Sequence, residues 1–410
     1  MRKVLIIGAV WVEPNSSAAG SRMLQLIELF LRENYQVTFA TTTQKTENAF
    51  DLKSINVNVI SIELNSSSFD EFVKELNPTI VVFDRFMIEE QFGWRVADCC
   101  PNAIRILDTE DLHSLRKERH EALKRNIDFS IDKLLDSDIV KREIAAIYRC
   151  DVSLIISTFE IEILQSVFNI DTSLLYHLPF LLNEIDIKTQ KKWKSFEERN
   201  HFVTIGNFLH APNVDAVLQL RKTIWPLIRE QLPNAEINVY GAYPTQQILE
   251  LHSKKEGFLI KGYADNANEV VSGAKVALAP LRFGAGIKGK LSQAMLCGTP
   301  SVTTRIGAEG MHANLPWNGF IVENESDLAI KAVELYTGET IWKQFQKNGA
   351  EIINQLYNEE KLIPIFIAKV ESLISNLKAH RKQNFIGALL QYQTLRSTKY
   401  MSKWIEEKNK

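Results

Sequence analysis

Residues 280–310 read PLRFGAGIKGKLSQAMLCGTPSVTTRIGAEG, in which an apolar strand reaches a glycine turn that opens directly into a helix. Gly284 and Gly286 have no Cβ, so the backbone can turn tightly and a bulky anion can come close. The first N–H groups of a helix beginning near Ile287 have no partner within the helix, and the helix dipole attracts negative charge to them. The stretch therefore predicts a phosphate site large enough for a diphosphate.

The residues around this turn are basic. Arg282 precedes it, and Lys288 and Lys290 follow it in the first helical turn, where a cation disfavours the helix unless an anion is bound nearby. A second strand, 300–304, leads to another glycine-bounded turn at 306–310. An ordinary connecting loop is the alternative, but the basic flanks and the second turn favour an anion site.

Composition excludes several classes of protein. The 410 residues are 45% hydrophobic and 24% charged, which is typical of globular proteins and enough for two domains. The 48 basic and 50 acidic residues give a net charge of −2, so no general affinity for nucleic acid or acidic membranes is expected. Any anion site must be local.

The four cysteines are Cys99, Cys100, Cys150 and Cys297, which form no CxxC pair and no spacing suited to zinc. We therefore expect a reducing cytoplasm and no zinc site at the cysteines. The chain also offers no obvious metal cluster, and no bound cofactor is expected. The apolar run 4–7 is too short for a signal peptide core, and no other stretch reaches membrane-spanning length. The expected protein is soluble, or peripheral at the inner face of a membrane.

Short β-branched runs alternate with helical patterns, which predicts parallel sheets covered by helices on both faces. The expected strands form two series: 4–7, 36–41, 57–62, 79–84, 103–108 and 152–157, then 202–206, 236–240, 258–262, 275–279, 301–304 and 320–322. The fold class is α/β, with two doubly wound, Rossmann-like domains. The expected boundaries are 1–185, a polar linker at 186–200, 201–380, and a C-terminal amphipathic helix at 381–410. The carboxyl ends of both strand sets would face one cleft.

Two segments keep alternative interpretations. The charged helical insertion 112–149 is either a solvated face or an excursion over the cleft that binds an acceptor. The segment 381–410 carries seven Lys/Arg against two Glu, with apolar and aromatic residues at helical spacing. It is either a packed terminal helix or a helix lying on an anionic membrane surface.

These features together resemble the GT-B glycosyltransferases, specifically the retaining family-4 group, over nearly the whole chain. The motifs that carry the resemblance are FVTIGN and APNVD at 202–215, IWP at 224–226, VYGAYP at 239–244, and the stretch 284–310. The resemblance implies that the second domain holds a nucleoside diphosphate sugar as co-substrate and that the first domain positions an acceptor.

The resemblance also implies roles for particular residues of the donor site. The backbone amides of residues 284–287 would hold the diphosphate, and Lys288 or Arg282 would neutralise the leaving group without a metal. The residues expected to bind the donor are Gly206, Asn207, Gly284, Ala285, Gly286, Ile287 and Gln293. The family usually has two glutamates eight positions apart, where this chain has Ala285 and Gln293. Gln293 can still hydrogen-bond a ribose hydroxyl, whereas Ala285 contributes no side-chain contact.

In the first domain, relatives often place a His-Asp pair after the strand that ends here at Asp108. This chain has DTEDLHSLR at 108–116 instead, so different residues would carry that role. The residues expected to act in catalysis are Lys288, Arg282, Asp108, Glu110 and His113, and those expected to contact the substrate are Gly20, Asp111 and Arg116.

The leading hypothesis is a metal-independent glycosyltransferase that transfers a sugar with retention of configuration. Ala285 and Gln293 motivate a second hypothesis, a GT-B protein without catalysis that binds or regulates a partner. A nucleotide-sugar epimerase of the same fold is the third. The sequence leaves open the nucleotide, the sugar, the oligomeric state and the acceptor, which could be a glycan, a lipid carrier, a metabolite, a protein or an RNA.

Overall fold

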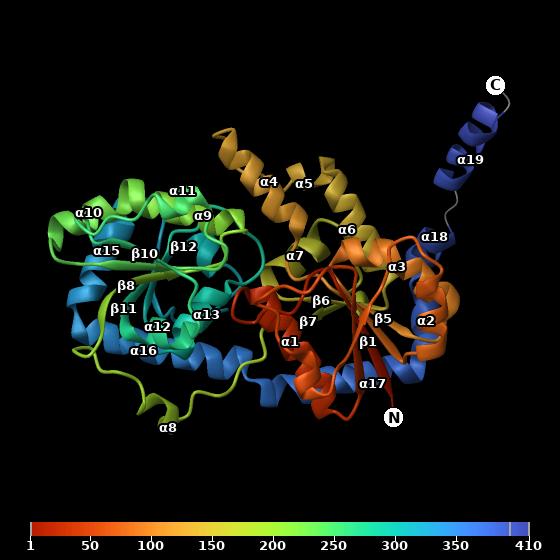
Figure 1. Cartoon of the computed structure of the whole chain (residues 1–410), viewed down its shortest axis with the longest axis horizontal. Helices are drawn as coiled ribbons and strands as arrows, with labels where there is room; N and C mark the ends of the chain where they lie inside the picture. The colour runs from red at the N-terminus through yellow and green to blue at the C-terminus, as the bar shows by residue number, and fades with distance from the viewer. Residues whose placement is uncertain (1, 393–394, 409–410) are drawn as a thin grey trace.

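The computed structural model describes residues 2–392 and 395–408. The first domain is built on a sheet of seven parallel strands in the order β3-β2-β1-β4-β5-β6-β7 (Figure 1). These strands are β1 (Lys3–Gly8), β2 (Gln36–Thr41), β3 (Asn58–Ser61), β4 (Ile80–Asp84), β5 (Ile104–Asp108), β6 (Val152–Ile155) and β7 (Leu175–His177). The apolar runs of β1, β4 and β5 are buried on both faces, as parallel strands between two helical layers require.

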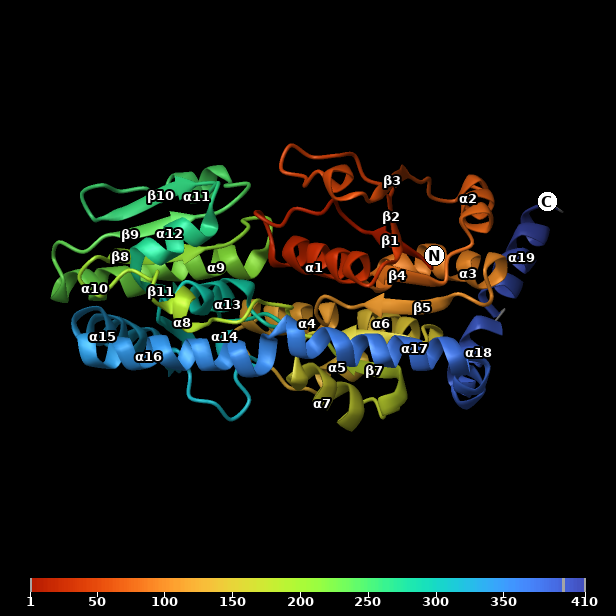
Figure 2. The same ribbon diagram turned by 90° about the horizontal axis from the view of Figure 1, so that it is seen from below.

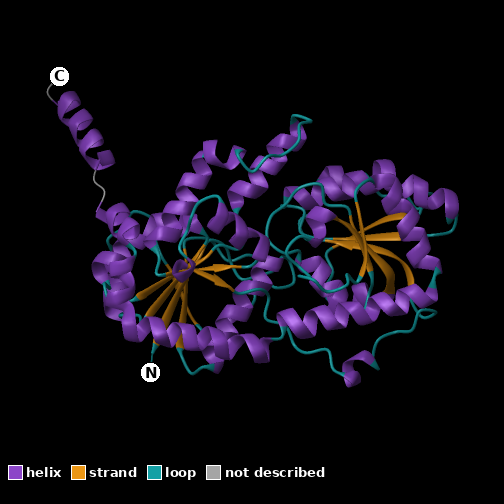
Figure 3. Cartoon of the chain, turned by 180° about the vertical axis from the view of Figure 1, so that it is seen from behind, coloured by secondary structure: helices purple, strands orange, loops and turns teal. Residues whose placement is uncertain are grey.

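Helices cover both faces of this sheet (Figure 3). One face packs on α1 (Ala18–Arg32) and α17 (Glu359–Gln383). The other packs on α2 (Ser68–Leu76), α3 (Phe86–Cys99), α4 (His113–Lys124), α5 (Lys133–Asp136), α6 (Asp138–Arg149) and α7 (Thr158–Ser166). The first strand series is therefore confirmed, and β7 is a seventh, three-residue strand that the sequence pattern did not indicate.

The second domain has six parallel strands in the order β10-β9-β8-β11-β12-β13. They are β8 (Asn200–Ile205), β9 (Ile237–Tyr240), β10 (Phe258–Gly262), β11 (Ala274–Ala279), β12 (Ser301–Thr304) and β13 (Gly319–Val322). The helices are α9 (Ala211–Gln219), α10 (Trp225–Gln231), α11 (Gln246–Leu249), α12 (Ala267–Gly273), α13 (Gly289–Leu296), α14 (Arg305–Ala308), α15 (Glu325–Thr337) and α16 (Glu339–Ile352). The predicted α/β class with two Rossmann-like domains is confirmed.

The chain crosses between the domains twice. The segment after β7 contains the short helix α8 (Ile187–Gln190) and leads into β8. The return crossing follows α16, and α17 then runs along the first domain (Figure 2). Ile363, Phe366 and Val370 of α17 are buried in the same core as Val4 and Ile6 of β1.

The expected boundary of the second domain, 201–380, is wrong at its end, because α17 packs on the first domain. The apolar spacing of 363–373 specifies a helix with one buried face, but spacing alone does not say which domain that face contacts. The chain therefore connects the two domains twice, through the segment between β7 and β8 and through the segment between α16 and α17.

The segment 381–410 also differs from one expected helix. Residues 381–383 end α17, α18 spans Phe385–Tyr392, and α19 spans Leu395–Lys408. Residues 393–394 and 409–410 lie outside the described part of the chain. In Figure 1, α19 projects away from the body of the protein.

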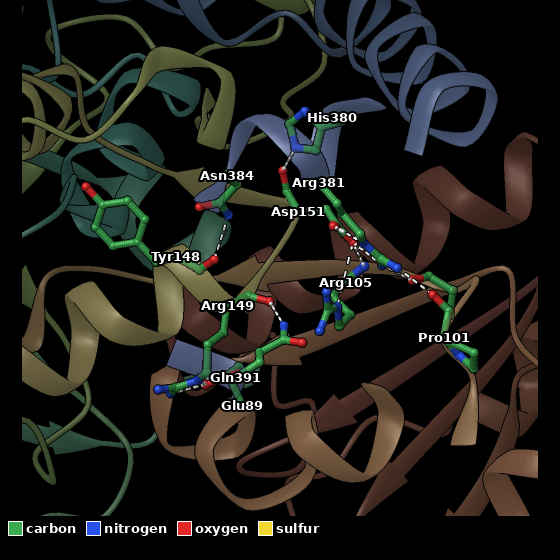
Figure 4. Close-up of polar contacts among 11 residues, drawn as sticks. Glu89, Pro101, Arg105, Tyr148, Arg149, Asp151, His380, Arg381, Asn384 and Gln391 are labelled. Atoms are coloured by element: carbon green, nitrogen blue, oxygen red, sulfur yellow. Dashed lines mark hydrogen bonds and ion pairs between the residues drawn. The ribbon is translucent and has the colours of Figure 1, made fainter. Parts of the chain in front are cut away.

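A polar cluster fixes the end of α17 to the first domain (Figure 4). Arg381 Nε and Nη2 donate to the two carboxylate oxygens of Asp151, each at 2.7 Å, and Asp151 also accepts from the Arg105 N–H at 2.8 Å. Asn384 Nδ2 donates to the Tyr148 carbonyl oxygen at 2.7 Å. These contacts lie at the amino ends of β5 and β6, away from the cleft.

Candidate functional site

A cavity of about 940 Å³ lies between the two domains, where the carboxyl ends of both sets of strands meet. Open α/β sheets bind ligands at this edge. It brings together most of the residues expected from the sequence: Glu110, Asp111, His113, Arg116, Gly206, Asn207, Gly284, Ala285, Gly286, Ile287, Lys288 and Gln293. Residues 265–268, which follow β10, complete the side near Gln293.

The glycine loop follows β11 and leads into α13, which begins at Gly289 rather than near Ile287. Gly286 has φ of +63°, and a Cβ on it would lie 3.0 Å from the Cβ of Asp111 in the first domain. Both the left-handed backbone and this close approach require glycine. The Gly286 N–H donates to Glu160 Oε1 at 2.8 Å, so this amide, one of the four expected to hold the diphosphate, already has a partner in the first domain.

Two lysines line the cavity beside the loop. Lys288 Nζ donates to the Gly286 carbonyl oxygen at 2.6 Å, and burial lowers its pKa to about 8, partly opposed by Glu309. Lys290 Nζ donates to Asn213 Oδ1 at 2.8 Å, and burial lowers its pKa to about 8 as well. A buried ammonium is costly unless it is paired, so both groups favour a bound anion.

The cavity also contains Lys290, His210 and Asn213, which are not among the site residues expected from the sequence. His210 and Asn213 follow β8 and line the cavity. His210 is exposed to the cavity, but the surrounding walls of both domains desolvate its ring and lower its pKa to about 4, so its imidazole is neutral at pH 7. The available signal was the HAPN run directly after a strand of the second series.

The structure does not bring Arg282 to the cavity. Arg282 Nε donates to Asp215 Oδ2 at 2.9 Å on α9, and the side chain faces a separate hollow beside β12 and α15. The flanking residues Leu281 and Phe283 turn into the cavity instead. A role for Arg282 at the leaving group is therefore not supported by its position.

Asp108 and Gly20 are expected site residues that do not line the cavity. The buried Asp108 accepts from Arg22 Nε at 2.9 Å, which ties β5 to α1. Gly20 lies in the first turn of α1, where a Cβ would be 2.3 Å from the Glu13 carbonyl oxygen. Both residues support the site through packing rather than through contact with a ligand.

The acidic turn after β5 faces the glycine loop. Glu110 has φ of +61°, a left-handed conformation that is rare outside glycine and concentrates at functional sites. Its Oε1 is buried without a hydrogen-bond partner among the described residues. Burial and the nearby Asp108 raise the pKa of Glu110 to about 8, so this carboxyl is protonated at pH 7 and can donate a hydrogen bond.

Asp111 and His113, on the same turn as Glu110, differ in charge at neutral pH. Asp111 forms an ion pair with Arg116, which holds the pKa of that carboxyl below its usual value despite burial. Burial lowers the pKa of His113 to about 4, and its Nε2 lies 3.5 Å from Asp111 Oδ1. The side of the cavity formed by this turn thus offers a neutral carboxyl in Glu110 and a neutral imidazole in His113, beside the Asp111–Arg116 ion pair, and these groups suit hydroxyl groups.

Gln293 lies one turn into α13 and lines the cavity. Its Nε2 is 3.4 Å from Asn268 Oδ1, on the loop that follows β10. Within residues 2–392 and 395–408, no three His, Cys, Asp or Glu side chains are grouped so that they could hold a metal ion. Metal-independent chemistry remains a prediction.

Comparison with known proteins gives a family match over the second domain and a fold for the chain. Residues 199–338 match the family model described as Glycosyl transferases group 1, and no curated protein matches the chain. Similar solved structures include a variant of S. aureus TarM, solved with fondaparinux, alpha-GlcNAc-glycerol and UDP (TM-score 0.69, 10% identity). That match covers 90% of this chain and 100% of TarM. The chain has the GT-B fold.

Two further GT-B structures have similar scores. Sucrose-phosphate synthase from Thermosynechococcus elongatus has a TM-score of 0.69 at 14% identity, over 92% of this chain and 100% of that one. HepE from Anabaena, solved with UDP and glucose, has a TM-score of 0.68 at 12% identity. That match covers 91% of this chain and 100% of the HepE chain. The predicted resemblance to GT-B glycosyltransferases is confirmed, and the family match lies on the domain that contains the glycine loop and its lysines.

Glu110 gives a prediction for this GT-B protein. If the cavity binds a sugar for transfer, Glu110→Ala should lower kcat about 10²-fold, because the hydrogen bond that this half-buried carboxyl would donate to a sugar hydroxyl is lost. Glu110→Gln, which can still donate, should keep most of the activity. Because the donating form requires a protonated carboxyl, wild-type kcat should fall as pH rises through about 8, whereas kcat of Glu110→Gln should not. Steady-state kinetics between pH 6 and 9 checks both points, and equal loss in the two variants would contradict a neutral donor.

Proposed function

We propose that this protein transfers a sugar from a nucleoside diphosphate sugar to an acceptor, with retention of configuration. The observation that carries the proposal is the pair of half-buried lysines, Lys288 and Lys290, beside a glycine loop in the interdomain cavity. The same cavity presents the strained, neutral Glu110 on its opposite side. One side thus suits a diphosphate and the other suits sugar hydroxyls.

The residues divide the work by their chemistry. Lys288 and Lys290 would neutralise the diphosphate as the glycosidic bond breaks, which lowers the energy of the developing charge. Gln293 would hydrogen-bond a ribose hydroxyl, with residues 265–268 beside the base. Glu110, His113 and Asp111 would orient the sugar and the acceptor. Retention rests on the resemblance to the family-4 group.

Work on similar proteins supports the donor class. HepE was solved with UDP and with UDP-glucose, and TarM was solved with UDP. A uridine nucleotide is therefore the first donor to test here. The acceptor is open among glycans, lipid carriers, metabolites, proteins and RNA.

The test is incubation with a panel of nucleoside diphosphate sugars, with and without an acceptor mixture, followed by analysis of nucleotide and sugar products. Release of nucleoside diphosphate that rises with acceptor would support transfer. An altered sugar still attached to its nucleotide would indicate the epimerase instead. Nucleotide binding with no product from any sugar would favour the hypothesis of a GT-B protein without catalysis. That hypothesis is based on Ala285 and Gln293, which stand where the family usually has glutamates.

We also propose that α18 and α19 rest on an anionic membrane surface. The segment 381–410 has a net charge of +5, while the chain as a whole carries −2. Tyr400 and Trp404 of α19 are 63% and 57% exposed, and aromatic residues beside basic ones suit a lipid headgroup region. No helix of the described residues is long and apolar enough to cross a bilayer. A cytoplasmic location at the inner face of a membrane would follow from this contact.

Vesicle sedimentation tests this surface. The protein should sediment with phosphatidylglycerol vesicles and much less with phosphatidylcholine vesicles. The double variant Tyr400→Glu/Trp404→Glu should lose roughly tenfold in binding, because it removes apolar contact and adds repulsion. Ile330→Glu, an equally exposed position on α15 of the other domain, is the matched control. Equal sedimentation of the double variant and the control would exclude the surface.

A further inference from the structure

The backbone of the glycine loop is held by side chains of the other domain. Arg119 Nη1, from α4, donates to the Gly284 carbonyl oxygen at 2.8 Å. Glu160 Oε1, from α7, accepts from the Gly286 N–H at 2.8 Å. These two peptide groups flank Ala285, so the first domain fixes the loop on both sides of its centre.

Each of these side chains has a second anchor. The Arg119 guanidinium forms a bidentate ion pair with Glu309, with Nη1–Oε1 and Nη2–Oε2 both at 2.8 Å. Glu309 follows α14 in the second domain. Glu160 Oε1 also accepts from the Leu112 N–H at 2.9 Å, immediately before α4 begins. The two holding residues therefore belong to one connected unit of the first domain.

Because these side chains are buried, separation of the two domains would leave them without their hydrogen-bond partners. Glu160 is 0% exposed and Arg119 is 8% exposed, and a buried carboxyl or guanidinium group that loses its hydrogen-bond partner is unfavourable. If the domains moved apart, Arg119 would lose both Gly284 and Glu309, and Glu160 would lose Gly286. The loop would then have no side chain of the first domain to set its shape.

We propose that Arg119 and Glu160 are positioning residues that give the glycine loop its diphosphate-binding shape only when the two domains are closed. The proposal rests on the proposed function for the role of the loop, but the holding contacts themselves can be tested without a donor. A stacked contact between His120 and Phe283, with ring centroids 4.2 Å apart, lies on the same junction and would form with them. Donor affinity and domain closure are coupled through these contacts.

Hydrogen exchange of the segment 282–290 in the nucleotide-free protein tests the holding contacts directly. Glu160→Ala and Glu309→Gln should speed exchange of this segment about tenfold, the loss of roughly one hydrogen bond of 1.4 kcal/mol. Glu160→Gln keeps an acceptor oxygen and should retain slow exchange. Arg125→Ala, an exposed position just after α4, is the control. Unchanged exchange in both Glu160→Ala and Glu309→Gln overturns the proposal.

UDP titration of the same variants gives the second readout. Glu309→Gln should weaken UDP about tenfold, although Glu309 does not line the cavity. Wild-type affinity in Glu309→Gln with fast exchange would show that the loop shape does not govern binding, which also overturns the proposal. A wild-type protein that binds no nucleotide would contradict the proposed function alone, because the exchange measurement does not depend on a ligand.

Discussion

Replacement of Lys290 by Met is expected to weaken the binding of nucleoside diphosphates about 10²-fold while leaving the melting temperature unchanged or higher. A charge-assisted hydrogen bond to a phosphate contributes about 3 kcal/mol, which corresponds to this factor. The half-buried Lys290 ammonium forms no ion pair with any carboxylate among the described residues, and its hydrogen bond is to the Asn213 amide oxygen. Removal of this cation therefore relieves a cost of burial in the free protein.

Titration calorimetry and thermal unfolding of the same preparation check the two halves of this prediction. Lys222→Met, at an exposed position after α9 and outside the cavity, is the matched control and should change neither quantity. A large fall in melting temperature would mean that Lys290 serves the fold. Unchanged affinity with an unchanged fold would remove Lys290 from the donor site.

The pH dependence of binding follows from the same lysines. A lysine whose pKa in the folded protein is about 8 is protonated below pH 8 and neutral above it. Affinity for a diphosphate should therefore be highest below pH 8 and fall as pH rises through that value. In Lys290→Met the fall should be shallower, because only Lys288 still titrates.

The largest effect on stability is expected for Arg22→Met, at about 3–5 kcal/mol, because it leaves the carboxylate of Asp108 buried without a cation. Asp108 is 0% exposed and accepts from Arg22 Nε, and Arg22 Nη1 also donates to the Leu178 carbonyl oxygen at 2.7 Å. This single side chain thus joins α1, the end of β5 and the segment after β7.

Denaturant unfolding measures the loss. Arg32→Met on the same helix breaks an exposed ion pair with Glu359 and should cost less than about 1 kcal/mol. The double variant Arg22→Met/Asp108→Leu should recover part of the stability, because neither charge is then left alone. A loss in Arg22→Met no greater than in Arg32→Met would mean that the buried pair is not a main support of the site.

The sequence predicted the features that depend on local pattern. Both strand series follow from short β-branched runs, and the glycine loop follows from glycines placed between a strand and a helix. The prediction that Arg282 acts at the leaving group is not supported. Its nearness to Gly284 in sequence does not reveal the ion pair with Asp215, which lies 67 positions away and holds its side chain. At this tight turn, Gly284 lines the cavity, whereas the side chain of Arg282, two residues earlier, points away from it.

Features that depend on contacts between distant segments were not predictable in this way. The apolar face of α17 could have covered either domain, and only the folded chain places Phe366 against the first. Likewise, the sequence does not show which of the acids of 108–111 are buried, ion-paired or neutral. In the folded chain, Asp108 is a buried partner of Arg22, Glu110 is a neutral carboxyl on a strained backbone, and Asp111 is an ion-paired carboxylate.

The central claim is that the interdomain cavity binds a nucleoside diphosphate through the glycine loop and its lysines. We would titrate the wild-type protein and Lys288→Met with a panel of nucleoside diphosphates and their sugars and follow thermal stability. A ligand at a hundred times its Kd stabilises the folded state by about 2.7 kcal/mol, so binding is readily seen. The account predicts stabilisation by one nucleotide family that is lost in Lys288→Met. No stabilisation of the wild type by any nucleotide, or equal stabilisation of both proteins, would contradict it.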